Sequence, residues 1–280
     1  MRLSGKYCAV WSDAASRMFW AALACGLLCF PAFASFVPHQ AVYAISLERN
    51  AQSSSIESVS GRTAFQIEDG CDSWSSIEDY AIIFGFAEGQ ESRFISHYET
   101  WEAKDGSGFS FKVEEFSTME GEQVYEGFVN ADGGKAEAYF ADGTDTVVAL
   151  PEDTLFPILH LAKLLEAAAA GETVRQSSLF LGGDAEDALY LTNSLVGKPR
   201  QVAADSRIQA LVPDALQEQR YWPMRIAFFK ADSVAAEPEY EIDYEIQDNG
   251  LIRSYIVDYG SFSMRAELQK VKLLQAPVCS

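Results

Sequence analysis

The side chains that could carry out acid, base or metal chemistry are few in this sequence. The three histidines, His39, His97 and His160, fall on an early predicted strand, a middle strand and a helix. No His-x-x-x-His or Cys-x-x-Cys pattern is present, so the sequence predicts neither a metal site nor a cofactor site. A Ser-His-Asp triad stays open because its members can lie far apart in sequence, although no Gly-x-Ser-x-Gly elbow is present.

Paired carboxylates are the other groups that could act, because two acids that flank a sugar linkage can hydrolyse glycans. Glu114 with Glu115, and Glu99 with Glu102, are the candidate pairs. Residues 35–280 contain 40 acidic residues, so such pairs arise by chance, and a glycan hydrolase ranks third among the functions considered. Aromatic side chains can form sugar platforms, but we interpret the following as core residues: Trp74, Trp101 and Trp222.

Residues 1–34 have the composition of a secretory signal peptide, with a basic start and an uncharged apolar run from 18 to 31. Ala32-Phe33-Ala34 supplies the small-x-small site, so we predict cleavage after Ala34. The apolar run, about fourteen residues, is shorter than the roughly 20 that a membrane-spanning helix needs. A lipid anchor on Cys25 is the weaker alternative, because Cys25 lies too near the start of the run. The basic residues are Arg2, Lys6 and Arg17.

Cleavage at this site would leave only two of the five cysteines. Cys8, Cys25 and Cys29 would be removed, and Cys71 and Cys279 would remain. Two cysteines outside the cytoplasm usually pair, so we predict a disulfide between them. The bridge would close a loop of about 200 residues, for which chain entropy gives roughly 5 kcal/mol and measured bridges more often about 2 to 4 kcal/mol. A redox or metal role would require a second thiol or histidine close by, and none is present in the sequence around them.

The mature chain, residues 35–280, carries 18 basic and 40 acidic residues, a formal charge of −22. This charge repels nucleic acid and anionic lipid headgroups. The acids are scattered along the chain, as on the evenly solvated surface of a folded domain. The length suits one large β domain or two small ones, and no Pro- or Ser-rich linker is long enough to separate two.

Alternation of apolar and polar residues dominates from Phe36 onward and predicts a mainly β protein. Glycine-containing turns separate the runs, and Asn249-Gly250 predicts a type I′ hairpin, in which both residues have positive φ. Pro223 predicts an edge strand or a bulge. The predicted strands are 39–48, 55–66, 77–86, 94–101, 109–116, 123–129, 136–140, 146–150, 173–181, 188–196, 222–228, 239–247, 251–259 and 262–268, with a loop or short helix within 199–213.

One segment, about 154–170, has the periodicity of a helix. Asp153 or Thr154 is predicted to cap its start. His160, Lys163 and Glu166 are predicted to form a narrow polar face, and nearly all the other residues are Leu, Ile, Phe or Ala. A helix this apolar needs cover on most sides. We therefore predict a buried helix inside, or across the mouth of, a single curled antiparallel sheet, an open barrel-like arrangement.

Several short motifs occur along the chain in a fixed order. They are His39-Gln40-Ala41-Val42-Tyr43, Gly70-Cys71-x-x-Trp74, Thr154-Leu155-Phe156-Pro157, Asn249-Gly250, Asp258-Tyr259-Gly260-x-Phe262 and Cys279. Together they resemble the cell-envelope integrity protein EipB family of Gram-negative bacteria, over nearly all of the mature chain, although Asp72-Ser73 stands before Trp74 where a glycine is expected. The resemblance implies a periplasmic β-spiral with a disulfide between Cys71 and Cys279. It also implies a role in envelope homeostasis through a periplasmic tetratricopeptide-repeat protein, with no known catalytic activity.

We therefore predict a non-enzymatic periplasmic protein, with one β-spiral domain at residues 35–280, that maintains envelope integrity by binding a tetratricopeptide-repeat protein. The alternative is a carrier that holds a lipid or acyl chain in the concave face of the sheet. An envelope-glycan hydrolase comes third. The sequence does not identify the partner-binding residues.

Overall fold

The computed structural model describes residues 36–52, 54–132, 135–141, 146–203, 206–231 and 235–279. These residues belong to one compact unit, 33–280. None of the helices in the described ranges is long and apolar enough to cross a membrane. The predicted signal peptide, residues 1–34, lies outside the described residues.

The described chain forms 15 β-strands, one α-helix and three short 3-10 helices. Each predicted run is a strand, and only the two-residue β11 was not predicted. Alternating burial along the strands, as in β10, gives the period of two on which the prediction depended. The elements are β1 (His39–Asn50), β2 (Ile56–Asp69), β3 (Ser73–Phe86), η1 (Ala87–Gly89), β4 (Glu91–Ala103), β5 (Gly108–Ser117), β6 (Gly121–Asp132), β7 (Lys135–Phe140), β8 (Val147–Leu150), α1 (Pro157–Ala170), β9 (Val174–Phe180), β10 (Leu189–Val196), β11 (Arg200–Gln201), η2 (Gln209–Leu211), η3 (Asp214–Leu216), β12 (Arg220–Lys230), β13 (Tyr240–Ile246), β14 (Ile252–Asp258) and β15 (Phe262–Leu273).

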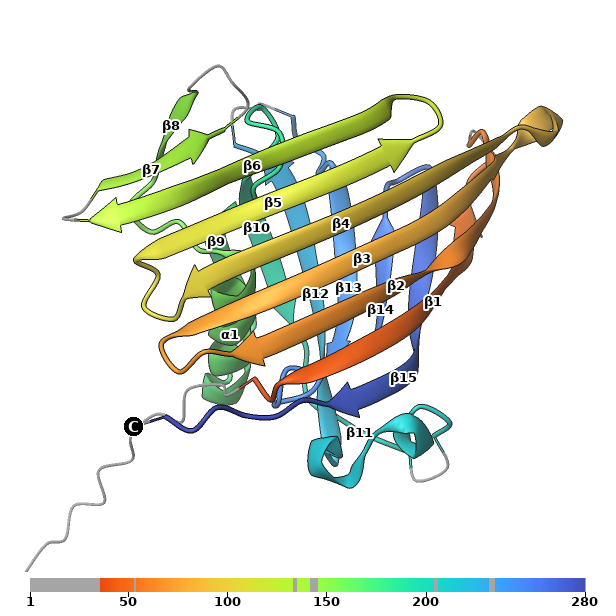
Figure 1. Ribbon diagram of the computed structural model, residues 1–280. Helices are drawn as coiled ribbons and strands as arrows, with labels where there is room; N and C mark the ends of the chain where they lie inside the picture. Colours follow the sequence, from red (N-terminus) through yellow and green to blue (C-terminus); the bar gives the residue numbers. More distant parts are fainter. Residues whose placement is uncertain are drawn as a thin grey trace, which may run out of the picture. The chain divides into compact units, whose positions relative to one another are not determined.

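All the strands belong to one open antiparallel sheet, which confirms the predicted fold class. The order is β8-β7-β6-β5-β4-β3-β2-β1-β15-β14-β13-β12-β10-β9, and β11 pairs with β12 beside this path. The first and last strands, β1 and β15, pair at the middle, so β1–β8 form one half and β9–β15 the other (Figure 1). The sheet edges β8 and β9 do not pair, but Leu155, just after β8, forms a single parallel bridge with Leu179 of β9.

Helix α1 lies between the two halves of the curled sheet (Figure 1). Ile158, Leu164 and Leu165 are buried in a cluster that includes Trp74 of β3 and Trp222 of β12. Burial of large apolar side chains is the main favourable term in folding, about 1.5 to 3 kcal/mol for each fully buried one. The helix therefore supplies much of the core that an open sheet lacks, as predicted.

The start of α1 is capped by a side chain from the sheet and not by its own sequence. The helix begins at Pro157, and neither Asp153 nor Thr154 caps it, so that prediction was wrong. Glu102 of β4 is 0% exposed and accepts hydrogen bonds from the backbone N–H groups of Ile158, at 3.0 Å, and Leu159, at 2.6 Å. Burial raises the pKa of Glu102 to about 7, and the two N–H groups oppose this rise. A carboxylate from a distant strand thus satisfies donors that a helix start leaves without intrahelical partners.

His160 does not belong to a polar face, which corrects the predicted helix arrangement. It is 2% exposed, because strands cover the side of the helix that carries it. Its Nε2 lies 3.4 Å from Thr192 Oγ1 on β10. Burial lowers its pKa to about 4, so the ring is neutral at physiological pH. Lys163 and Glu166 form an ion pair at 2.9 Å.

Two local predictions in the second half were also wrong. The β13–β14 hairpin lies where Asn249-Gly250 predicted it, but only Gly250 has a positive φ, of 85°, so the turn is not type I′. The side-chain amide of Asn249 donates a hydrogen bond to the backbone oxygen of Leu216. Pro223 lies inside β12, opposite Glu245, with no bulge at that position. It is tolerated there because β10 ends at Val196, so no strand requires the missing N–H.

Cys71 and Cys279 are joined by a disulfide, and their Cα atoms are 5.7 Å apart. Cys71 occupies the β2–β3 turn with φ 68°, and its N–H donates to Asp69 Oδ1. Cys279 lies beyond β15, in a segment that is largely exposed. The bridge therefore attaches the end of the chain to the first third of the sheet.

Cys279→Ser should lower the melting temperature by roughly 4 to 16 °C, because removal of a long-loop bridge costs roughly 2 to 4 kcal/mol. Cys71→Ser and the double variant should melt at the same temperature as Cys279→Ser, because all three lack the same bond. Differential scanning calorimetry measures this. Peptide mapping without reductant should recover the linked peptides, and free thiols in protein taken from the periplasm would contradict the assignment.

Glu102→Ala should destabilise the fold by roughly 2 to 4 kcal/mol, because two buried N–H donors at the start of α1 lose their acceptor. Glu99→Ala is the matched control: it lies on the same strand but is exposed, and we expect a change within about 0.5 kcal/mol. Urea unfolding of both variants tests this. Equal effects would mean that the carboxylate does not anchor the helix.

Candidate functional site

The interior of the curled sheet contains two adjoining hollows of about 290 and 520 Å³. We call the two together the interior cavity. They share a wall from β3, β4, β13 and β14 and the segment after β9, and helix α1 borders the smaller one. The volumes lie near or within the range of ligand pockets, about 300 to 1,000 Å³. The shared lining residues are Tyr80, Tyr98, Leu181, Tyr240, Ile242, Tyr255 and Val257.

Strand alternation places a set of tyrosines around the interior cavity. Tyr240 and Tyr244 are four residues apart on β13, an even spacing that puts both side chains on the inner face, and Tyr244 lies opposite Tyr255 of β14. Tyr98 of β4 lies opposite Glu78 of β3. Each tyrosine side chain combines an apolar ring with a polar hydroxyl, which is typical of sites that bind partly polar ligands.

Glu78 is the carboxylate of the smaller hollow. The hydroxyl of Tyr80 donates to it at 2.6 Å. Burial raises the pKa of Glu78, the hydrogen bond from Tyr80 opposes this, and the charge of Asp79 adds to it. Burial also raises the pKa of Tyr98 and Tyr244, and the charge of Glu78 contributes to both rises. The phenols therefore stay protonated at physiological pH, so Glu78, and not a tyrosine, is the group of this hollow that can carry a negative charge.

The described lining of the interior cavity contains no lysine or arginine side chain. Its titratable groups other than tyrosines are Glu78, Glu115 and His160. Burial raises the pKa of Glu115, and His160 is neutral. The electrostatic potential of the cavity therefore comes from carboxylates that no basic side chain of the wall neutralises.

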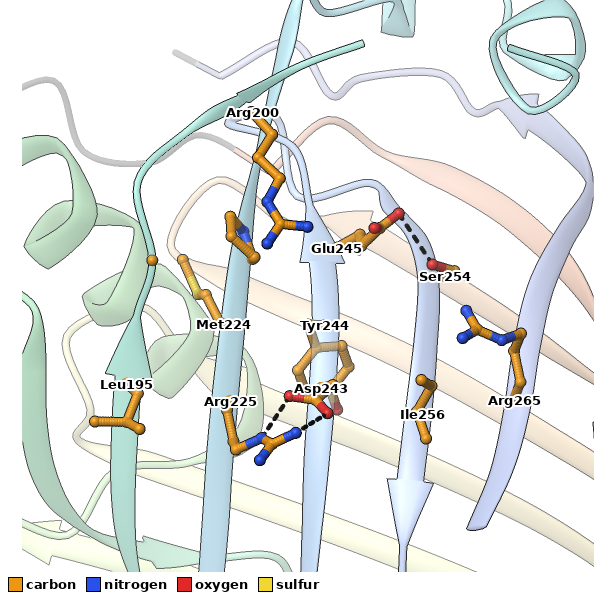
Figure 2. Close-up of a pocket in the computed structure, with 12 residues that line it drawn as sticks. Leu195, Arg200, Met224, Arg225, Asp243, Tyr244, Glu245, Ser254, Ile256 and Arg265 are labelled. Atoms are coloured by element: carbon orange, nitrogen blue, oxygen red, sulfur yellow. Dashed lines mark hydrogen bonds and ion pairs between the residues drawn. The ribbon is translucent and has the colours of Figure 1, made fainter. Parts of the chain in front are cut away.

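The sheet also has a polar groove of about 410 Å³ on the outer side of β10 and β12–β15 (Figure 2). Arg225 donates to both oxygens of Asp243, at 2.7 and 2.6 Å, which Figure 2 shows as a forked contact. Arg265 pairs in the same way with Glu48, at 2.8 and 2.8 Å. Two of the three arginines that line this groove, Arg225 and Arg265, are therefore already paired with a carboxylate.

A second outer groove, of about 690 Å³, lies across β3–β6 and carries exposed aromatic side chains. Trp101 is 44% exposed, which overturns its interpretation as a core residue; the other two tryptophans, Trp74 and Trp222, are buried. Phe128 is 51% exposed and stacks on Tyr139, with ring centroids 5.0 Å apart. Strand register aligns a row on the outer face that we call the outer aromatic row: Trp101, Ser110, Phe128, Tyr139 and Val147.

The candidate catalytic pairs do not form. Glu114 and Glu115 are adjacent on β5 and point to opposite faces, as do Glu99 and Glu102 on β4. Glu114 is paired with Lys112 on the outer face, and Glu102 is buried under the helix. Two carboxylates on opposite faces of a sheet cannot flank one sugar linkage.

The three histidines are not brought together as a site. His97 is on the outer face, where Nδ1 contacts Asp79 at 2.6 Å and Nε2 contacts Glu99 at 3.0 Å. These hydrogen bonds raise its pKa, and neither ring nitrogen is left to accept a proton from a nucleophile. His39 is buried, with Nδ1 at 2.7 Å from Val37 O.

Sequence reasoning missed the interior carboxylate Glu78, and it named Glu102 only as a candidate catalytic acid and not as the cap of the helix. One signal was present: Glu78 stands at the same parity along its strand as Trp74 and Tyr80, which places it on the apolar face. A charged residue at an inward position of a strand is unusual and marks a site or a cap.

Comparisons with known proteins give one consistent result. The model of the family described as EipB-like matches residues 31–275. The cell envelope integrity protein EipB of Brucella abortus (strain 2308) is 28% identical over 269 residues, which are 94% of this chain and 92% of that protein. A crystal structure described as a beta-barrel-like protein of a domain of unknown function, also from Brucella abortus, is 26% identical with a TM-score of 0.77 and covers 86% of this chain and 99% of that chain.

Glu78→Gln should stabilise the protein, and the gain should grow as the pH rises. Because burial raises the folded-state pKa of Glu78, the wild type takes up a proton on folding and loses stability as the pH rises from about 4.5 through that raised pKa. The neutral amide lacks this dependence. Glu57→Gln, an exposed site on β2, is the control, and it should change stability by less than about 0.5 kcal/mol at every pH. Urea unfolding at roughly every pH unit from pH 4 to 9 gives the difference in free energy of unfolding between Glu78→Gln and the wild type. A difference that does not change with pH would contradict the assignment.

Proposed function

This chain belongs to the EipB-like family, and we propose that it maintains the integrity of the cell envelope from the periplasm, by binding and not by catalysis. The name of the Brucella relative supports the envelope role. The predicted signal peptide and the disulfide support a periplasmic location, because disulfides persist in oxidising compartments.

We propose that binding is to a protein, of the tetratricopeptide-repeat type that the family resemblance implies. The outer aromatic row is the observation that carries this proposal. Exposed aromatic side chains grouped on one face are unusual on a soluble surface, and tryptophan and tyrosine often dominate the energy of protein interfaces. The polar residues around the row, such as Glu99, Lys112 and Glu126, would form the rim of such an interface.

The placement of the titratable groups supports a non-catalytic role. Both nitrogens of His97 are engaged by carboxylates, and His160 is buried and neutral. The carboxylate pairs that a glycan hydrolase would need are split between the two faces of the sheet. The envelope-glycan hydrolase alternative therefore loses both of the carboxylate pairs on which it rested.

The second candidate function, a carrier of a lipid or acyl chain, is favoured by one specific observation. The interior cavity is lined mainly by apolar side chains and tyrosine rings, and it lies in the concave face of the sheet, where the alternative expects a ligand. Protein binding on the outer face and ligand binding inside do not exclude one another.

Replacing Trp101 and Phe128 together by alanine should abolish envelope protection and partner capture while the free energy of unfolding changes by less than about 1 kcal/mol. The reason is that both side chains are exposed, so they add little to the core. The assay is growth of a strain that lacks the gene, on detergent or a cell-wall antibiotic, after complementation with each variant. Affinity purification from envelope extract gives the partner directly.

Two controls make this test specific. Leu191 and Leu195 are 48% and 52% exposed on β10, far from the outer aromatic row along the sheet, and their double alanine variant should protect fully. His97→Gln should also protect fully, because the proposal needs no titrating histidine. Full protection by the Trp101 and Phe128 variant would reject the outer aromatic row as the docking surface, and loss of protection with folded His97→Gln would favour a histidine-dependent enzyme.

A further inference from the structure

The cavity contains a carboxylate with no cation to balance it, and this limits the ligands that it can hold. Glu78 lies inside the sheet, with Tyr80 as its hydrogen-bond donor and Tyr98 opposite it on β4. The wall formed by the described residues supplies no lysine or arginine to the carboxylate. An ion pair with a ligand would provide the missing countercharge.

The rings around Glu78 suit a cation in particular. Tyrosines from β1, β3, β4, β13 and β14 line the same hollow as Glu78, among them Tyr43, Tyr80, Tyr98, Tyr244 and Tyr255. The face of an aromatic ring carries partial negative charge and attracts an ammonium group within about 6 Å of its centre. Carboxylate and rings therefore favour a positive headgroup and disfavour a phosphate, sulfate or carboxylate.

The larger hollow suits an apolar tail. It adjoins the Glu78 hollow through Tyr80, Tyr98 and Tyr255 and has a volume of about 520 Å³. Apolar side chains from β3, β4, β5, β14 and β15 form most of its wall, and Ser96 and Glu115 are its polar side chains besides the tyrosines. The apolar ones from these strands are Ile82, Phe84, Phe94, Val113, Val257 and Met264. Burial of methylene groups against such a wall is favourable by the hydrophobic effect.

We propose that the interior cavity binds an amphiphile with an ammonium headgroup, with the head against Glu78 and the alkyl tail in the larger hollow. This inference rests on the carrier function proposed above and names its ligand class. The head is selected by the charge of Glu78 and by the tyrosine rings. The tail is selected by size and apolarity alone.

The test compares three probes with the same ten-carbon tail and different heads: decyltrimethylammonium, decyl sulfate and decyl maltoside. Each is titrated below its critical micelle concentration into the mature protein, at fixed ionic strength, by isothermal calorimetry. We expect the ammonium probe to bind at one site at least ten-fold more tightly than the neutral probe, and the sulfate probe to bind more weakly than either. Glu78→Gln should remove at least ten-fold of the affinity for the ammonium probe and leave the affinity for the maltoside unchanged.

Glu57→Gln is the matched control, because it removes one negative charge from the surface of a strongly acidic protein. It should leave all three affinities unchanged. If it weakens ammonium binding as much as Glu78→Gln does, the attraction is to the surface and the proposal falls. If all three probes bind alike, the carrier function stands and the headgroup assignment is overturned, whereas no binding by any probe overturns both.

Discussion

The structure depends on how one helix is held against a sheet that does not close. Glu102 on β4 accepts hydrogen bonds from the backbone of Ile158 and Leu159 and so fixes the start of α1 between the halves of the sheet. The first turns of α1, through Pro157, Ile158 and Leu161, form one wall of the interior cavity. The contact that anchors the core therefore also shapes the cavity, and the disulfide fixes the chain end on the same half of the sheet.

Acidic residues have different environments on the two faces of the sheet. On the outer face they pair with cations, as Asp243 does with Arg225 and Glu48 does with Arg265. On the inner face Glu102 is fully buried and Glu78 partly buried, no described lysine or arginine pairs with either, and burial raises the pKa of both. Desolvated carboxylates without a countercharge cost stability, and they are retained where they cap a helix or meet a ligand. Glu102 has the first role, and for Glu78 we propose the second.

The two faces suit two kinds of binding. The outer aromatic row presents the exposed rings of Trp101 and Phe128, a surface that suits a protein partner, whereas the interior cavity is lined by residues from both halves of the sheet. A protein that carries a small ligand inside and contacts a partner outside can pass information between the two only if the sheet or α1 moves.

Much of the fold could be predicted from the sequence, because a strand needs only local alternation to be recognised. Alternation identified the strands and helical periodicity identified the apolar helix, whereas the two paired cysteines followed from the predicted cleavage site and the family from short motifs. The candidate site could not be predicted in full, since alternation does not show which face is inside where a strand has large apolar side chains on both faces, as β4 does. Trp101 and Tyr98 lie on the same strand with opposite parity, and only the curl of the sheet makes one exposed and the other part of the cavity wall. The side chain that caps the start of α1 could not be predicted from the sequence either, because Glu102 is 56 residues from Ile158 and contacts it only in the tertiary fold.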